Sequence, residues 1–148
     1  MKNKKYITIF SIALIIIFSD QLTKFLIRKN LQLNESIQII KSIFHLTYLN
    51  NTGSAFSLFQ GYNLFFIIFS VIVIIAIIHF VKKIKESQKL MQLAVSLLLG
   101  GTFGNFIDRI IYGKVTDFID FRIWPVFNVA DSAVTVSVII FIILLWEK

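Results

Sequence analysis

The sequence has no cysteine, a single proline and few charged residues, and each shortage excludes a class of protein. Without cysteine there is no disulfide, no thiolate nucleophile and no cysteine-ligated metal. Only 16% of the 148 residues are charged and 57% are hydrophobic, so the chain lacks the polar surface of a small soluble domain. Long polar or glycine-rich linkers are also missing. The composition predicts one integral membrane domain over residues 1–148.

Four apolar runs account for most of this hydrophobic content. A helix needs about 20 residues to cross about 30 Å of hydrocarbon, and each run approaches that length. The runs cover residues 6–27, 64–81, 90–106 and 127–146. The sequence therefore predicts an all-α membrane protein built as a bundle of four transmembrane helices.

The formal net charge of +7 indicates membrane orientation and not nucleic-acid binding, because the lysines form no continuous patch. Short loops rich in lysine favour the cytoplasmic side of a membrane. Lysines precede the first run and crowd the link between the second and third, at positions 2, 4, 5, 82, 83, 85 and 89. We expect both termini to be cytoplasmic and residues 28–63 and 107–126 to be outside.

The first external stretch has the composition of a small β structure. β-Branched and aromatic residues occupy positions 43–49, and an Asn-Asn-Thr-Gly turn signal follows them. This pattern favours a short hairpin or small sheet on the membrane surface. We expect a β-like cradle above the helices.

Polar side chains interrupt three of the four runs at a similar depth. With a rise of 1.5 Å per residue, Asp20, Asp131 and Asn105 lie about 21, 22 and 24 Å from the inner face. Polar groups are costly in lipid, so they should face one another across the bundle. The sequence predicts a polar layer just beneath the outer surface.

Two features of the runs have purely structural explanations. Asp20 and Lys24 lie four residues apart on one helical face, acid before base, which favours a structural ion pair. Gly100 and Gly104 form a Gly-x-x-x-Gly pair, whose usual meaning in an apolar helix is close helix packing.

Structural explanations also exist for the acids near the ends of the later helices. Asp131, with Ser132 beside it, has the residue type of an N-cap at the start of the fourth helix. Asp108 and Arg109 fit a helix end whose charges are solvated or paired. Spacing alone leaves these explanations open.

Carboxylates are the titratable groups in best supply for chemistry in the polar layer. His79 falls near the inner end of the second run, no Ser–His pair is apparent, and no His-Glu-x-x-His zinc motif occurs. Two carboxyls in a partly dry site do not both ionise readily, so one acts as acid and the other as base toward water. This favours peptide hydrolysis with no covalent intermediate, no metal and no cofactor.

Four sequence blocks, SDQLTK, NTGSAF, GGTFGNFIDRIIYGKVTDF and FNVAD, lie at residues 19–24, 51–56, 100–118 and 127–131. In order and placement they resemble the signature blocks of bacterial lipoprotein signal peptidase, also called signal peptidase II. The resemblance extends over nearly the whole chain. It implies an intramembrane aspartyl endopeptidase that cleaves the signal peptide from diacylglyceryl-modified prolipoproteins at the lipobox cysteine.

The same resemblance implies a location and further partners. It places the protein in the bacterial cytoplasmic (inner) membrane, with an extracytoplasmic β-like cradle and an active site near the outer face. Membrane lipids surround such an enzyme, and cyclic peptides such as globomycin are expected to inhibit it.

The resemblance also assigns residues. The catalytic pair maps to Asp117 and Asp131, which lowers the weight of the capping explanation for Asp131. Asn51 and Asn128 match polar positions that line the site, where an amide can donate to the scissile carbonyl as charge develops on it. Supporting or substrate-binding positions are Asp20, Lys24, Gly53, Gly101, Asn105, Asp108, Arg109 and Ala130. Asp120 falls outside the motif and is interpreted as a solvated loop acid.

The link between the two aspartates, residues 118–130, is shorter than we expect for the family. The catalytic pair can survive this shortening if the missing residues belong to an external loop, because loops tolerate deletions better than helices do. Phe56 and Phe127 are expected to line a lateral groove for the diacylglyceryl group. The alternative is a small proton-coupled membrane transporter that uses Asp20 and Lys24.

Overall fold

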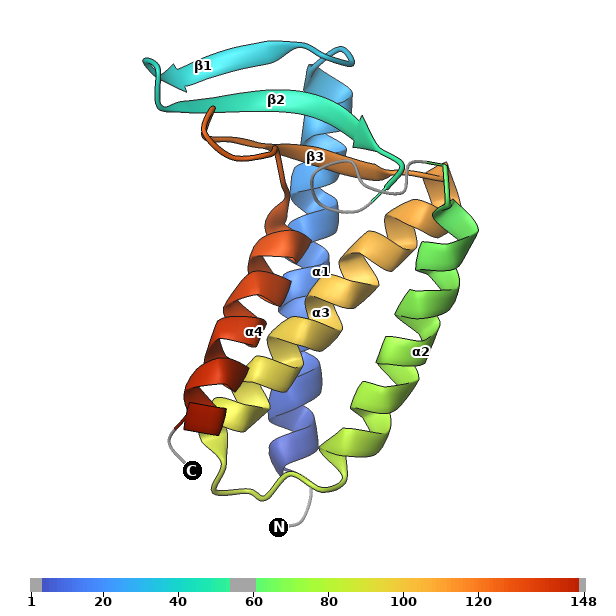
Figure 1. Ribbon diagram of the computed structural model, residues 1–148, viewed down its shortest axis with the longest axis vertical. Coiled ribbons are helices and arrows are strands. Elements are labelled where there is room, and N and C mark those ends of the chain that lie inside the picture. The colour runs from blue at the N-terminus through green and yellow to red at the C-terminus, as the bar shows by residue number, and fades with distance from the viewer. Residues whose placement is uncertain (1–3, 54–60, 147–148) are drawn as a thin grey trace.

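Four helices form a bundle, as the sequence predicts (Figure 1). The computed structural model describes residues 4–53 and 61–146. The helices are α1 (Lys4–Asn30), α2 (Asn63–Val81), α3 (Lys89–Tyr112) and α4 (Val129–Trp146). Each is long and apolar enough to cross a membrane.

A small antiparallel sheet lies across one end of the bundle, opposite the start of α1 and the end of α4 (Figure 1). Its strands are β1 (Ser36–Ile40), β2 (Phe44–Asn51) and β3 (Val115–Asp120), in the order β1-β2-β3. The predicted β structure around residues 43–49 is confirmed as β2, but the hairpin turn lies at residues 41–43, before this strand, and not at the Asn-Asn-Thr-Gly signal that follows it. The third strand comes from the second external stretch, where the sequence predicted only a loop.

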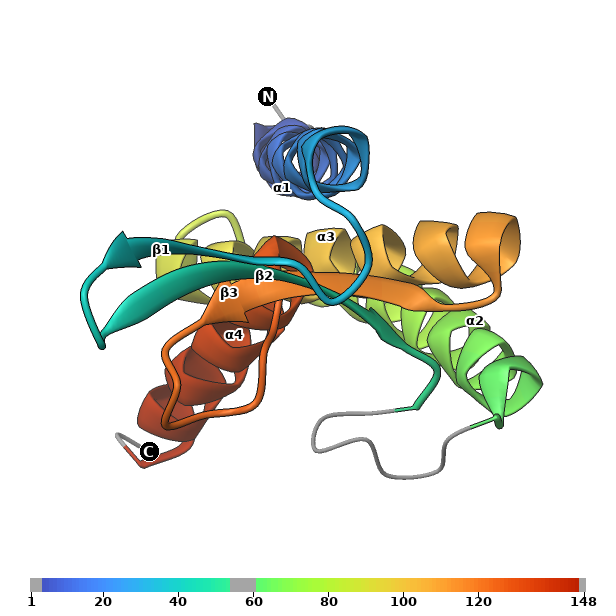
Figure 2. The same ribbon diagram turned by 90° about the horizontal axis from the view of Figure 1, so that it is seen from above.

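Helix α3 is the centre of the bundle. In the most apolar stretch of α3, 50% of the residues are buried, against 22%, 22% and 17% in the corresponding stretches of α1, α2 and α4. Seen from the sheet end, α1 lies on one side of α3, and α2 and α4 lie on the other (Figure 2). The outer three helices therefore leave most of their apolar surface for lipid.

Small residues let the neighbouring helices approach α3. A Cβ added at Gly100 would lie 2.8 Å from Cβ of Ile16 on α1, and one at Gly104 would lie 2.6 Å from Oδ2 of Asp20. Gly101 faces α4, where an added Cβ would lie 2.5 Å from the carbonyl oxygen of Ala130. The predicted close packing at Gly100 and Gly104 is confirmed, and Gly101 extends it to a second helix.

The end of α3 differs from the prediction, because the helix continues beyond residue 106 to Tyr112. It ends at Gly113, whose φ of 71° is left-handed and whose N–H donates to the carbonyl of Arg109 at 3.1 Å. Asp108 therefore lies within the helix and is fully buried. The interpretation of Asp108 as a solvated group at a helix end is wrong, whereas a paired one is consistent with its contacts described below.

Candidate active site

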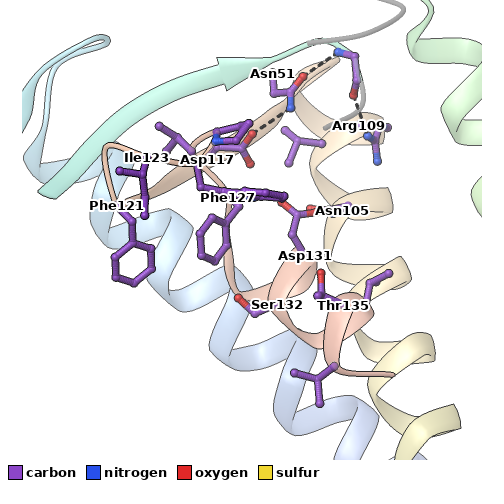
Figure 3. Close-up of a pocket in the computed structure, with 17 residues that line it drawn as sticks. Asn51, Asn105, Arg109, Asp117, Phe121, Ile123, Phe127, Asp131, Ser132 and Thr135 are labelled. Carbon is purple, nitrogen blue, oxygen red and sulfur yellow. Dashed lines mark hydrogen bonds between the residues drawn. The ribbon is translucent and has the colours of Figure 1, made fainter. Parts of the chain in front are cut away.

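Asp117 and Asp131 line one cavity of about 690 Å³ beneath the sheet (Figure 3). Asp117 comes from β3, and Asp131 comes from the first turn of α4. The polar part of the cavity wall also contains four of the predicted supporting residues, which are Asn51, Gly53, Asn105 and Arg109. Segments that are distant in the sequence thus converge on two carboxyls.

Asn128 joins the two aspartates. Its side-chain nitrogen donates to Oδ1 of Asp117 at 2.7 Å, and its side-chain oxygen accepts from the backbone N–H of Asp131 at 2.9 Å. In return, the backbone N–H of Asn128 donates to Oδ2 of Asp131 at 3.3 Å. This reciprocal pair is a capping box, in which Asn128 is the N-cap and Asp131 is the third helical residue. The idea that Asp131 itself is the N-cap is therefore wrong.

Asn51 is the second asparagine that contacts Asp117. Its side-chain nitrogen donates to Oδ2 of Asp117 at 3.0 Å, and its side-chain oxygen accepts from the N–H of Gly53 at 2.9 Å (Figure 3). The amides of Asn51 and Asn128, predicted to donate to a substrate carbonyl, thus donate to Asp117 in this structure. Both oxygens of that carboxyl accept a hydrogen bond.

Burial sets the protonation of Asp117, which is 3% exposed. Loss of water, followed by the negative charge of Asp131, raises the pKa of Asp117 from 3.8 to about 7. The hydrogen bonds from Asn51 and Asn128 and the charge of Lys24 oppose this rise without cancelling it. Asp117 can therefore hold a proton at near-neutral pH, as an acid catalyst must.

A buried charge cluster lies beside the pair. The ammonium of Lys24 lies 2.8 Å from Oδ2 of Asp20, 3.4 Å from Oδ2 of Asp108 and 2.9 Å from Oδ1 of Asn105. The other oxygen of Asp20 accepts from the N–H of Ala130 at 2.9 Å. The predicted Asp20–Lys24 ion pair is confirmed, and it links α1 to both α3 and α4.

Asp108 holds β3 in place next to the cavity. Its Oδ2 accepts from the backbone N–H of Thr116 at 2.9 Å, directly before Asp117. Arg28 lies 3.5 Å from the other oxygen of Asp108 and donates to Oγ1 of Thr116 at 2.9 Å. The sequence interpretation missed Arg28, although it follows Lys24 by four residues and so shares its helical face.

Arg109 anchors the opposite end of the cavity. Its guanidinium donates to the carbonyl of Gly53 at 3.2 Å and lies over the ring of Phe66, 4.9 Å from the ring centroid. This contact connects α3 to the segment after β2 and to α2. Arg109 thus contacts both the cavity wall, at Gly53, and α2, at Phe66.

Asp120 is not the solvated loop acid that the sequence suggested. It is 5% exposed on β3, where it accepts from the hydroxyl of Thr47 at 2.7 Å and from the backbone and side chain of Arg122 at 2.8 and 3.1 Å. Burial alone would raise the pKa of Asp120, but these hydrogen bonds together with the charge of Arg122 lower it. Asp120 does not line the cavity, and it holds the turn after β3.

The other side of the cavity is apolar. Phe121 and Phe127 stack with ring centroids 6.0 Å apart, and Ile123 and Trp124 line the cavity while remaining largely exposed (Figure 3). Phe127 lines the cavity as expected, whereas Phe56 lies outside the described residues. The cavity therefore joins two carboxyls to an apolar surface.

A protein-family model describing signal peptidase (SPase) II matches residues 12–147. A lipoprotein signal peptidase of Halothermothrix orenii is 42% identical over 95% of this chain and 96% of its own length. One from Bacillus subtilis is 42% identical over 90% of each chain. A solved structure described as a bacterial membrane enzyme at 2.3 Å resolution has a TM-score of 0.88 and 38% identity, over 95% of this chain and 88% of that one.

Proposed function

Since the chain belongs to the signal peptidase II family and is a multi-pass membrane peptidase, we propose that it cleaves diacylglyceryl-modified prolipoproteins by an aspartyl mechanism. Asp117 and Asp131 are the catalytic pair, and cleavage occurs at the lipobox cysteine. The observation that carries this proposal is the convergence of these two carboxyls on one cavity with an apolar wall. The family relatives are peptidases, so the transporter alternative is not supported.

The reaction requires one protonated and one ionised carboxyl. The ionised carboxyl takes a proton from water, whose oxygen attacks the scissile carbonyl carbon, while the neutral carboxyl gives its proton to the carbonyl oxygen. The resulting tetrahedral diol then collapses, the C–N bond breaks, and the newly protonated carboxyl gives its proton to the leaving nitrogen. The diol returns a proton to the other carboxyl, so the pair ends as it began.

The apolar wall suggests how a lipid-modified substrate is received. Phe121, Ile123, Trp124 and Phe127 lie on the same cavity as the two aspartates, and they offer an acyl chain a surface next to the scissile bond. A site just beneath the membrane surface meets this bond without withdrawing the lipid from the leaflet. Cyclic peptides such as globomycin would compete for the same cavity.

Membrane orientation follows from the distribution of charge. Exposed lysines surround the link between α2 and α3, whereas the sheet and both aspartates lie toward the opposite end of the bundle (Figure 1). We place the lysine-rich end and both termini in the cytoplasm of a bacterial cell and the active site near the outer face of its cytoplasmic membrane.

The test is release of the signal peptide from a purified diacylglyceryl-modified prolipoprotein. Asp117→Asn and Asp131→Asn should each lower the rate by about a thousandfold or more, because each removes a group that transfers a proton. Asp120→Asn is the matched control, since Asp120 shares β3 with Asp117 but lies outside the cavity, and it should stay within a few-fold of the parent rate. Normal cleavage by a folded Asp117→Asn or Asp131→Asn protein would refute the proposed pair.

A further inference from the structure

Lys24 fixes the orientation of the Asn105 side chain. An ammonium group can only donate hydrogen bonds, so the atom of Asn105 that it contacts at 2.9 Å is the amide oxygen. The side-chain nitrogen of Asn128 donates to the same oxygen at 3.2 Å. The amide nitrogen of Asn105 therefore faces the other way and donates to Oδ1 of Asp131 at 2.7 Å.

Asp131 also lies at the positive end of a helix. It occupies the first turn of α4, where the unpaired backbone N–H groups and the helix dipole favour a negative charge. Its second oxygen accepts the backbone N–H of Asn128. Asp131 thus has one hydrogen-bond donor that Lys24 orients, and it also lies in the favourable field at the start of α4.

The charge of Lys24 also acts on Asp117, but the other supports of the two carboxyls differ. Asp117 lies on a strand, and its side-chain donors among the described residues are the neutral amides of Asn51 and Asn128. The side-chain oxygen of Asn51 accepts from the backbone N–H of Gly53. The two carboxyls of the pair are therefore unequal.

The charges around the pair balance when it holds one proton. Asp20 and Lys24 act on Asp131 from α1, Arg109 acts on it from α3 and Asp117 from β3. Asp108 lies beside Lys24 and acts on Arg109. With Arg28 beside Asp108, the described residues around the pair supply three cations and two anions. A pair with one negative charge makes this buried cluster neutral, which buried charges require.

We propose that Asp131 is the ionised member of the pair and acts as the base toward water, that Asp117 is the protonated acid, and that Lys24 and Asn105 are positioning residues for Asp131. The proton of water then passes to Asp131, and the proton of Asp117 passes to the scissile carbonyl oxygen. This assignment rests on the proposed aspartyl function, to which it adds the role of each carboxyl.

The experiment compares the pH dependence of kcat/KM for two matched variants, with a lipidated substrate that has no group titrating in the range studied. Asn105→Leu removes a donor from Asp131, which should move the acidic limb up by about one pH unit and leave the alkaline limb in place. Asn51→Leu removes a donor from Asp117, which should move the alkaline limb up by about one unit and leave the acidic limb in place. Asp120→Asn should move neither.

The reversed pattern, with Asn105→Leu moving the alkaline limb and Asn51→Leu the acidic limb, would overturn the assignment. A fall in activity at every pH with both limbs unmoved would also overturn it, since a merely structural role gives that result. If Asn105→Leu fails to fold, Asn105→Ser and the Asn51 variant still decide the roles. Failure of the catalytic pair itself would appear separately, as cleavage by the Asp117→Asn or Asp131→Asn protein.

Discussion

Replacing Asp117 with asparagine should stabilise the folded protein at pH 8 while abolishing its activity. Folding raises the pKa of Asp117 from 3.8 to about 7. Between these two values the folded state binds a proton that the unfolded chain has already released, so stability falls as the pH rises from about 4 to about 7. Above pH 7 this loss is complete, and an asparagine, which is neutral at every pH, avoids it.

The size of the effect follows from the pKa change. A rise of about three units, at about 1.4 kcal/mol for each, corresponds to about 4 kcal/mol at pH 8. The amide oxygen of the new asparagine can accept from only one of Asn51 and Asn128, which costs about 1–2 kcal/mol. We therefore expect the free energy of unfolding to rise by about 2–3 kcal/mol at pH 8 and to change little at pH 5.

The measurement is unfolding in detergent at pH 5 and pH 8, followed by circular dichroism. Asp120→Asn is again the control, because the pKa of Asp120 is lowered by folding. Its carboxylate stabilises the protein above the unfolded pKa of 3.8 and loses that effect only as the pH falls through the lower folded value. That variant should be destabilised equally at both pH values. The reasoning would be refuted if the Asp117→Asn protein were less stable than the parent at pH 8. It would also be refuted if the substitution changed the free energy of unfolding by the same amount at both pH values.

Three further predictions concern packing and buried charge. Gly101→Ala should lower activity by about tenfold or more with helical content retained, because the new methyl would collide with the Ala130 carbonyl and shift α4; an unchanged rate would argue against this tight contact. Asp20→Asn should lower the free energy of unfolding by about 3 kcal/mol, since Lys24 loses its nearest carboxylate, and adding Lys24→Met should restore part of the loss. Lys5→Met removes hydrogen bonds to two backbone carbonyls in the loop after α2, so it should lower the free energy of unfolding by about 1–3 kcal/mol and leave KM unchanged. Thermal unfolding and a cleavage assay measure the two quantities.

The four helices could be predicted because each carries its own evidence in a long apolar run. Strand β2 was also predictable from its β-branched and aromatic residues, although the turn signal that follows it does not connect it to β1. Strand β3 could not be found in this way, because Val115–Asp120 contains two aspartates and pairs with a strand more than sixty positions earlier. Phe127 forms an isolated bridge to Ile119, eight positions earlier in the chain.

The candidate site was only partly accessible from residue positions. Depth along the helices grouped Asp20, Asn105 and Asp131, which the structure places in one connected hydrogen-bond network. Asp117 lies on β3, outside the helical runs, so only the resemblance to a family indicated it. Asp120 was misread for the same reason, since its burial depends on Thr47 of a distant strand.

The division of the proposed catalytic pair between β3 and α4 has a consequence for biosynthesis. Asp131 is carried by the final helix, and its orientation depends on Asn105 and Asn128 being already in position. A nascent chain that has inserted its first three helices holds Asp117 but not its partner. Under the proposed mechanism, hydrolysis therefore requires the last helix to be in place.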